Sequence, residues 1–119
     1  MDVSNTIGGS LQISTEVLAK IAQLAALEID GVFDTTAGSS QNVRGLLGKT
    51  GLQKAVTVTM EDGIAEVVVR LRVNYGVKIM PVCEQVQENV KQTIQNMTGI
   101  TVSRVDVIVT GLIEPAAEE

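Results

Sequence analysis

The sequence contains no histidine and no tryptophan, and it has one cysteine, one phenylalanine and one tyrosine among 119 residues. Without histidine and with a single thiol, only carboxylates remain as metal ligands, and no acidic spacing typical of a calcium loop occurs. The usual general base of a nucleophilic site is also missing. We therefore expect no metal and no other cofactor.

Long apolar runs are absent too. Nowhere do 18 apolar residues follow one another, so we expect no direct insertion into a membrane. The start, MDVSNTIGGS, has neither a basic region nor an apolar run, and the lone cysteine cannot form an intramolecular disulfide, which together predict a cytoplasmic protein. The formal net charge of -5 disfavours phosphate backbones, so nucleic acid is not an expected partner.

Hydrophobic residues make up 45% of the chain, almost all of them aliphatic, which suits one domain over residues 1–112 with a buried core. Leu11 to Ile13 is a candidate strand, and Ser14 can cap a helix that runs to about Ile29. Residues 35–53 contain four glycines, and their apolar residues show no sustained helical or strand periodicity, so we expect a flexible internal loop. Residues 113–119 should form an acidic, disordered tail.

Two strands then flank a hairpin turn at Glu61-Asp62-Gly63, which predicts antiparallel pairing. Residues alternate cleanly between an apolar and a polar phase, which is typical of a sheet with one buried and one wet face. The only aromatic residue expected in a strand, Tyr75, falls on the buried phase.

A second helix is predicted to begin near Pro81 and to end at Gly99, with an apolar stripe from Val82 to Ile94 at four-residue spacing. The last strand, Ile100 to Val109, changes phase, so a bulge is expected near Ser103 or Arg104. The predicted fold is an α+β two-layer sandwich in the order β-α-β-β-α-β, with an antiparallel sheet and both helices on one face.

Three groups of residues are candidates for function. Residues 43–50, VRGLLGKT, match the end of a phosphate-binding loop, but Val43 replaces the first glycine and a strand follows instead of a helix, which favours a loop without nucleotide. Cys83 lies in the first turn of the second helix, where the dipole lowers a thiol pKa. No base accompanies it, so a small buried hydrophobe is the favoured interpretation over a thiol nucleophile.

The third group is the polar sheet face. It is expected to carry Arg70 and Arg72 together with Glu66, Arg104 and Asp106. Recognition of RNA by such a face needs aromatic stacking platforms, and none is expected there. Two interpretations remain: a solvated face of mixed charge, or a face for protein binding or self-association through the open sheet edge.

Residues 9–112 also carry a recognisable pattern of short motifs. Gly31-Val32 follows the first helix, and the pairs Tyr75-Gly76 and Val86-Gln87 precede the triplet Met97-Thr98-Gly99. With these motifs at this spacing, the chain resembles the alkaline shock protein family of Gram-positive bacteria, which are small envelope-stress or general stress proteins.

The resemblance implies a non-enzymatic protein without catalytic residues, held near the membrane through a membrane-anchored protein partner and able to assemble into oligomers. Some relatives are linked instead to fatty-acid or acetyl-CoA metabolism, so an accessory regulator of that metabolism is the alternative that the resemblance leaves open.

Overall fold

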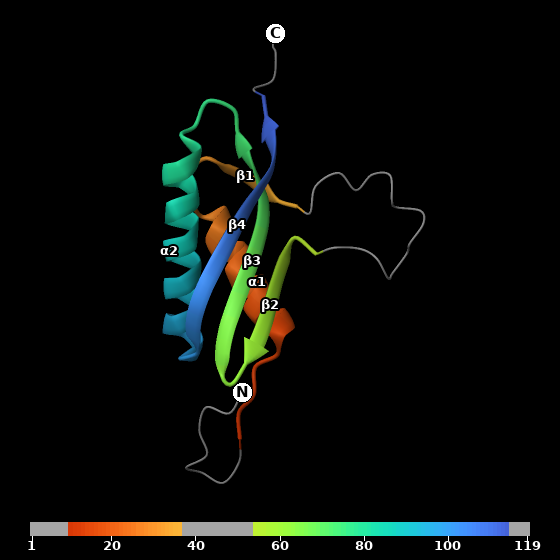
Figure 1. Cartoon of the computed structure of the whole chain (residues 1–119), viewed down its shortest axis with the longest axis vertical. Coiled ribbons are helices and arrows are strands. Elements are labelled where there is room, and N and C mark those ends of the chain that lie inside the picture. Colours follow the sequence, from red (N-terminus) through yellow and green to blue (C-terminus); the bar gives the residue numbers. More distant parts are fainter. Residues whose placement is uncertain (1–9, 37–53, 115–119) are drawn as a thin grey trace, which may run out of the picture.

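The computed structural model describes residues 10–36 and 54–114 (Figure 1). Two helices and four strands follow in the order α1 (Thr15–Leu27), β1 (Val32–Thr35), β2 (Val56–Glu61), β3 (Ile64–Asn74), α2 (Ile79–Thr98) and β4 (Thr101–Ile113). Both helices cover the same face of one sheet, so the predicted α+β two-layer class is confirmed. The phosphate-loop candidate at 43–50, most of the predicted loop and residues 115–119 of the predicted tail lie outside the described residues.

The sheet is built around β3. Strand β4 pairs in parallel along its whole length, while β2 pairs antiparallel with Ile64 to Val69 and β1 antiparallel with Leu71 to Val73. Strands β1 and β2 therefore share one edge of β3, end to end. The prediction of an entirely antiparallel sheet is wrong for β4, because α2 carries the chain back along the sheet before β4 begins, as a parallel crossover requires.

The first strand also differs from the prediction. Residues 11 to 13 form no strand, and Leu11 is exposed. The fourth strand of the sheet is instead β1, which includes Thr35, the first residue of the predicted loop. Strand β2 begins opposite Val69, so the backbone of β3 beyond that residue needs another partner, and β1 supplies it.

The hairpin between β2 and β3 is confirmed. Asp62 and Gly63 both have positive φ, 55° and 79°, which gives the two-residue turn that matches the twist of antiparallel strands. Alternate residues of β3 are fully buried beneath the helices: Ala65, Val67, Val69, Leu71 and Val73. Tyr75 does not continue this series, because β3 ends at Asn74 and the tyrosine side chain is exposed in the following turn.

Helix α1 begins as predicted, since Ser14 Oγ accepts a hydrogen bond from the Val17 N–H at 3.2 Å. It ends at Leu27, two residues earlier than expected. Its buried residues are Leu18, Ala22, Ala25 and Ala26. Val17 and Leu24 fit the three-and-four spacing of an apolar stripe with these residues, but they are half exposed because they lie on a flank of the helix turned away from the core.

Helix α2 begins at Ile79, so Pro81 is its third residue, still within the first turn where no intrahelical donor is needed. The stripe Val82, Val86, Val90 and Ile94 is buried, and Gly99 closes the helix with φ 78°, both as predicted. In β4 the pairing with β3 shifts between Val102 and Arg104, which confirms the bulge at Ser103. A second shift, at Thr110, lets the strand continue to Ile113, beyond the predicted end.

Candidate interaction face

The face of the sheet turned away from both helices is the candidate site, and we call it the outer face. Glu66, Arg70 and Arg72 alternate with the buried residues of β3 and therefore point to this face. The parallel register places Arg104 beside Glu66 and Asp106 beside Val68. The structure thus brings all five predicted residues together on one surface.

Arg72 is the most firmly held of these side chains. Its Nη2 and Nε donate to the two carboxylate oxygens of Asp34 at 2.6 and 2.9 Å, a bidentate pair that joins β3 to β1. The hydrogen bond to Asp34 is the main reason why the pKa of Arg72 is raised; burial opposes this effect, and the negative charge of Asp34 adds a smaller contribution that raises the pKa. The guanidinium carbon also lies 5.4 Å from the centre of the Phe33 ring, within range of a cation–π interaction.

Arg70 also turns toward the β1 and β2 side of the sheet. Its Nη1 donates to the backbone oxygen of Lys54 at 3.3 Å. Ile108 lies beside Arg70 on the other side, in β4, and this residue is 43% exposed. Both arginines direct their guanidinium groups toward β1 and β2, and Ile108 remains exposed, although the aliphatic part of Arg72 lies against Gly111 of β4.

The lower part of the outer face carries a looser ion pair. Arg104 Nη2 lies 3.4 Å from Asp106 Oδ2, and both side chains are about half exposed. Exposed pairs of this kind contribute little to stability. The charges of these two residues are therefore available to a partner with little loss of stability.

Sequence reasoning missed two residues of β1 and two aliphatic residues of the outer face. Phe33 and Asp34 contact Arg72, and Val68 and Ile108 form apolar surface next to the charges. The expectation that no aromatic residue serves this face is therefore wrong for Phe33. The segment VFDT has a composition typical of a strand, so β1 could have been predicted from it. The pairing of Asp34 with Arg72 could not, because no residue near either of them in the sequence indicates it.

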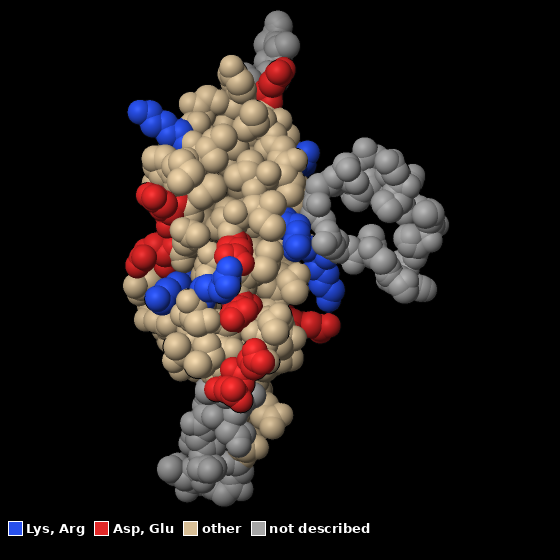
Figure 2. Space-filling model, in the orientation of Figure 1, with Lys and Arg blue, Asp and Glu red and all other residues tan. Residues whose placement is uncertain are grey.

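Charge is unevenly distributed over this side of the molecule. Figure 2 shows charged groups gathered over its lower and central part and a broad uncharged area above them. From Val107 to Ile113, β4 contains no charged residue. We define the outer apolar patch as Phe33, Val68, Ile108 and Ile113. Exposed apolar surface beside charged groups is typical of a protein-binding surface.

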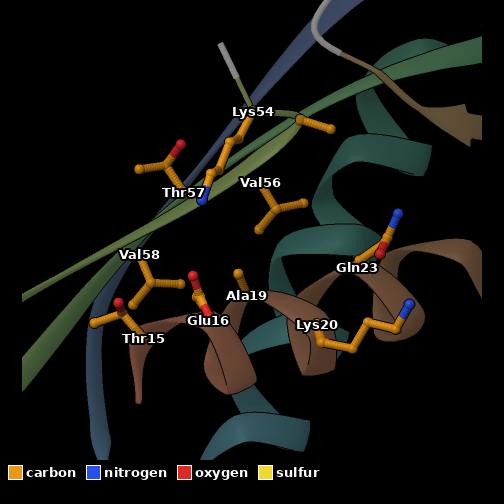
Figure 3. A pocket seen from close by; sticks show the side chains of 10 residues that line it. Thr15, Glu16, Ala19, Lys20, Gln23, Lys54, Val56, Thr57 and Val58 are labelled. Atoms are coloured by element: carbon orange, nitrogen blue, oxygen red, sulfur yellow. The ribbon is translucent and has the colours of Figure 1, made fainter. Parts of the chain in front are cut away.

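A groove of about 650 Å³ lies on the opposite side of the sheet, between α1 and β2 (Figure 3). Its charged lining residues are Glu16, Lys20 and Lys54, and the apolar residues Ala19 and Val58 also line it.

Cys83 is not among the lining residues of this groove, and burial raises the pKa of that thiol, which opposes the formation of a nucleophilic thiolate. Within residues 10–36 and 54–114, no three His, Cys, Asp or Glu side chains come together as metal ligands.

Neither helix of the described residues is long and apolar enough to cross a membrane. No solved structure matches the chain. Two proteins of Bacillus subtilis are similar to it: YqhY, 34% identical over 112 residues, covering 94% of this chain and 83% of YqhY, and YloU, 33% identical over 107 residues, covering 87% and 88%. The Streptococcus pyogenes protein Spy1614 is 34% identical over 110 residues, covering 91% of each.

A family model for the alkaline shock proteins, described as a family with a cell envelope-related function, matches residues 3–114. This match spans both helices and all four strands, including the motifs that carry the resemblance noted in the sequence. The chain therefore belongs to the alkaline shock protein family, a Gram-positive bacterial family with a cell envelope-related function.

Proposed function

We propose that this protein is a non-enzymatic interaction or scaffold module of the cell envelope, which works in the cytoplasm and is held near the membrane by a membrane-anchored protein. The outer face is the surface that binds this partner. The observation that carries the proposal is the outer apolar patch. Burial of exposed apolar surface beneath another protein is favourable in free energy, and the loosely paired charges beside the patch can contact the same partner.

The arrangement of the helices supports this choice of surface. Both α1 and α2 pack on the other face of the sheet, so the described residues leave the outer face without a covering layer. Ile108 lies midway along β4, an edge strand of the sheet, with Arg70 beside it in β3 and Asp106 two residues away in the same strand. A partner that covers Ile108 would also meet both signs of charge, which would fix its orientation.

The test is photocrosslinking in the native bacterium, with a photoreactive amino acid at position 108 of the full chain. We expect a crosslink to a membrane-anchored protein, and we expect Ile108→Asp to release the protein from the membrane fraction. Met97→Asp is the matched control, because Met97 is also exposed but lies on α2.

A native protein that stays in the soluble fraction and yields no crosslinked membrane protein would contradict the proposal. If Met97→Asp releases the protein and Ile108→Asp does not, the binding surface is on the helices instead. Recovery of an enzyme of fatty-acid metabolism would favour the alternative function of a regulator.

A further inference from the structure

The outer edge of β2 is open in the described part of the chain, where β2 pairs with β3 alone. The Arg70 N–H donates to the Ala55 carbonyl oxygen at 2.8 Å, so the carbonyl group of Ala55, just before β2, points toward β3. This contact fixes the direction of the backbone N–H and C=O groups of each residue in β2. In an antiparallel pair these groups alternate, so Thr57 and Thr59 bond to β3 while Val56, Val58 and Met60 point their N–H and C=O groups outward. Such an edge is a template for another strand.

The charges along this edge are segregated. Lys54 lies at one end, and Glu61 and Asp62 lie at the other, all of them exposed. The five residues from Val56 to Met60 between these ends are uncharged. An incoming strand would therefore meet positive charge at one end and negative charge at the other.

We propose that the strand that completes this edge is β2 of a second copy of the chain, paired antiparallel about a two-fold axis at Val58. This register places Lys54 opposite Asp62 of the second copy, and the two-fold axis forms the same pair twice. A parallel arrangement would bring Lys54 next to Lys54 of the second copy. Charge therefore selects the antiparallel, self-complementary arrangement, as expected of a symmetric dimer.

The side chains between the charged ends also match. In this register Val56 pairs with Met60 of the second copy on the helix side of the sheet, where Val56 is buried and Met60 partly buried. Thr57 pairs with Thr59 of the second copy on the outer face. Apolar residues thus meet apolar residues, and hydroxyls meet hydroxyls.

The groove between α1 and β2 provides room on the helix side. Glu16 and Lys20 lie one turn apart on its α1 wall, with Ala19 between them (Figure 3). The two-fold axis makes α1 of the second copy antiparallel to α1 of the first. Lys20 of the second copy therefore lies on the same side as Glu16 of the first copy. The small alanine side chain permits a close approach of the two helices.

The dimer makes one continuous sheet from the two four-stranded sheets and doubles the outer face that it presents to a partner. It does not depend on the proposed function, because the β2 edge and the outer apolar patch are separate surfaces. Loss of dimerisation and loss of partner binding are therefore distinguishable.

The experiment is sedimentation velocity of the purified full chain over a range of concentrations. The native chain is expected to dimerise. Lys54→Glu and Asp62→Lys each create two repulsive pairs in place of two attractive ones, and each alone should weaken the dimer roughly tenfold or more. In an equimolar mixture of the two variants both pairs are attractive again, so a heterodimer of near-native affinity is expected.

Lys91→Glu on α2 is the matched control for charge reversal and should leave the dimer unchanged, because Lys91 is exposed and far from β2 in the fold. Because Asp62 has positive φ, Glu61→Lys serves as a second variant at the same end of the edge if Asp62→Lys does not fold. Circular dichroism and thermal unfolding establish that each variant is folded.

A native chain that stays monomeric at all concentrations overturns the proposal, as does a monomeric chain that binds an extended peptide along β2. Dimers that survive both Lys54→Glu and Asp62→Lys, or that are lost in Ile108→Asp instead, would place the interface elsewhere. Failure of the mixed variants to associate would exclude the antiparallel register.

Discussion

The two faces of β3 are built from alternate residues of one strand, yet they are held by different forces. On the helix side, Val67, Val69 and Leu71 have no exposed surface and pack only against other aliphatic side chains. On the outer face, Arg70 and Arg72 keep their charged groups at the surface and bond to Lys54 and Asp34. The first face is maintained by burial and the second by a few directed contacts.

This difference separates stability from function. Burial of apolar surface is the dominant favourable contribution to folding, so substitutions on the helix side should affect the free energy of unfolding. Exposed ion pairs contribute little to the free energy of unfolding, so charged residues of the outer face can be substituted without unfolding the chain. The following three predictions test that division with paired substitutions, in order of decreasing effect.

Val67→Ala and Val68→Ala remove the same atoms from neighbouring residues on opposite faces. We expect Val67→Ala to lower the free energy of unfolding by about 2 to 3 kcal/mol, because it leaves a cavity beneath the helices. Val68→Ala should cost less than about 1 kcal/mol, because the site is partly open to water. Urea denaturation measures both values, and equal losses would show that the outer face is also part of the core.

Gly31→Ala and Gly111→Ala compare two glycines at which an added methyl group would meet a neighbour. At Gly31 the neighbour is a packed core side chain, and at Gly111 it is a flexible surface side chain. Gly31 has φ 103°, and an added Cβ would lie 2.9 Å from Val82 Cγ2 in the core, so we expect a loss of about 2 kcal/mol. At Gly111 the nearest atom is Arg72 Cδ at 3.2 Å, on a flexible side chain that can move away. That variant should lose less than about 1 kcal/mol by the same denaturation measurement. A reversed order would contradict the comparison.

Asp34→Ala removes the partner of Arg72 on the outer face. Both side chains are about one third exposed, so we expect a loss of about 0.5 kcal/mol, smaller still in high salt. A double-mutant cycle with Arg72→Ala isolates the coupling, and Asp106→Ala, which breaks a longer ion pair, is the control. A coupling of about 3 kcal/mol would mean that this pair behaves as a buried one.

The parts of the fold that could be predicted are those with a local cause. The hairpin follows from Asp62-Gly63, the cap from Ser14, and the end of α2 from Gly99, since each depends on one residue's backbone preference or hydrogen bond. The five charged residues of the outer face followed from period-two alternation together with the bulge in β4. Their phase on the polar face has this local cause, but the positions of Arg104 and Asp106 beside β3 depend on the β3–β4 register.

The errors in strand pairing involve contacts between distant segments, whereas the error at Tyr75 has a local cause. Asp34 and Arg72 are 38 residues apart, and nothing near either residue indicates that β1 pairs with β3. Tyr75 has the phase of a buried strand residue, but the strand ends before it because Gly76, at φ 100°, turns the chain toward α2. The half-exposed Val17 and Leu24 show that an apolar stripe can be wider than the surface that covers it.

Composition and spacing along the chain were enough to establish the two helices, the long strands, their buried phases and the absence of histidine chemistry. The packed molecule was needed to show that β4 runs parallel to β3, that β1 fills the edge beyond β2, and that Arg70 and Arg72 turn away from Ile108. These features depend on which backbone groups and side chains remain unsatisfied once the other elements have packed.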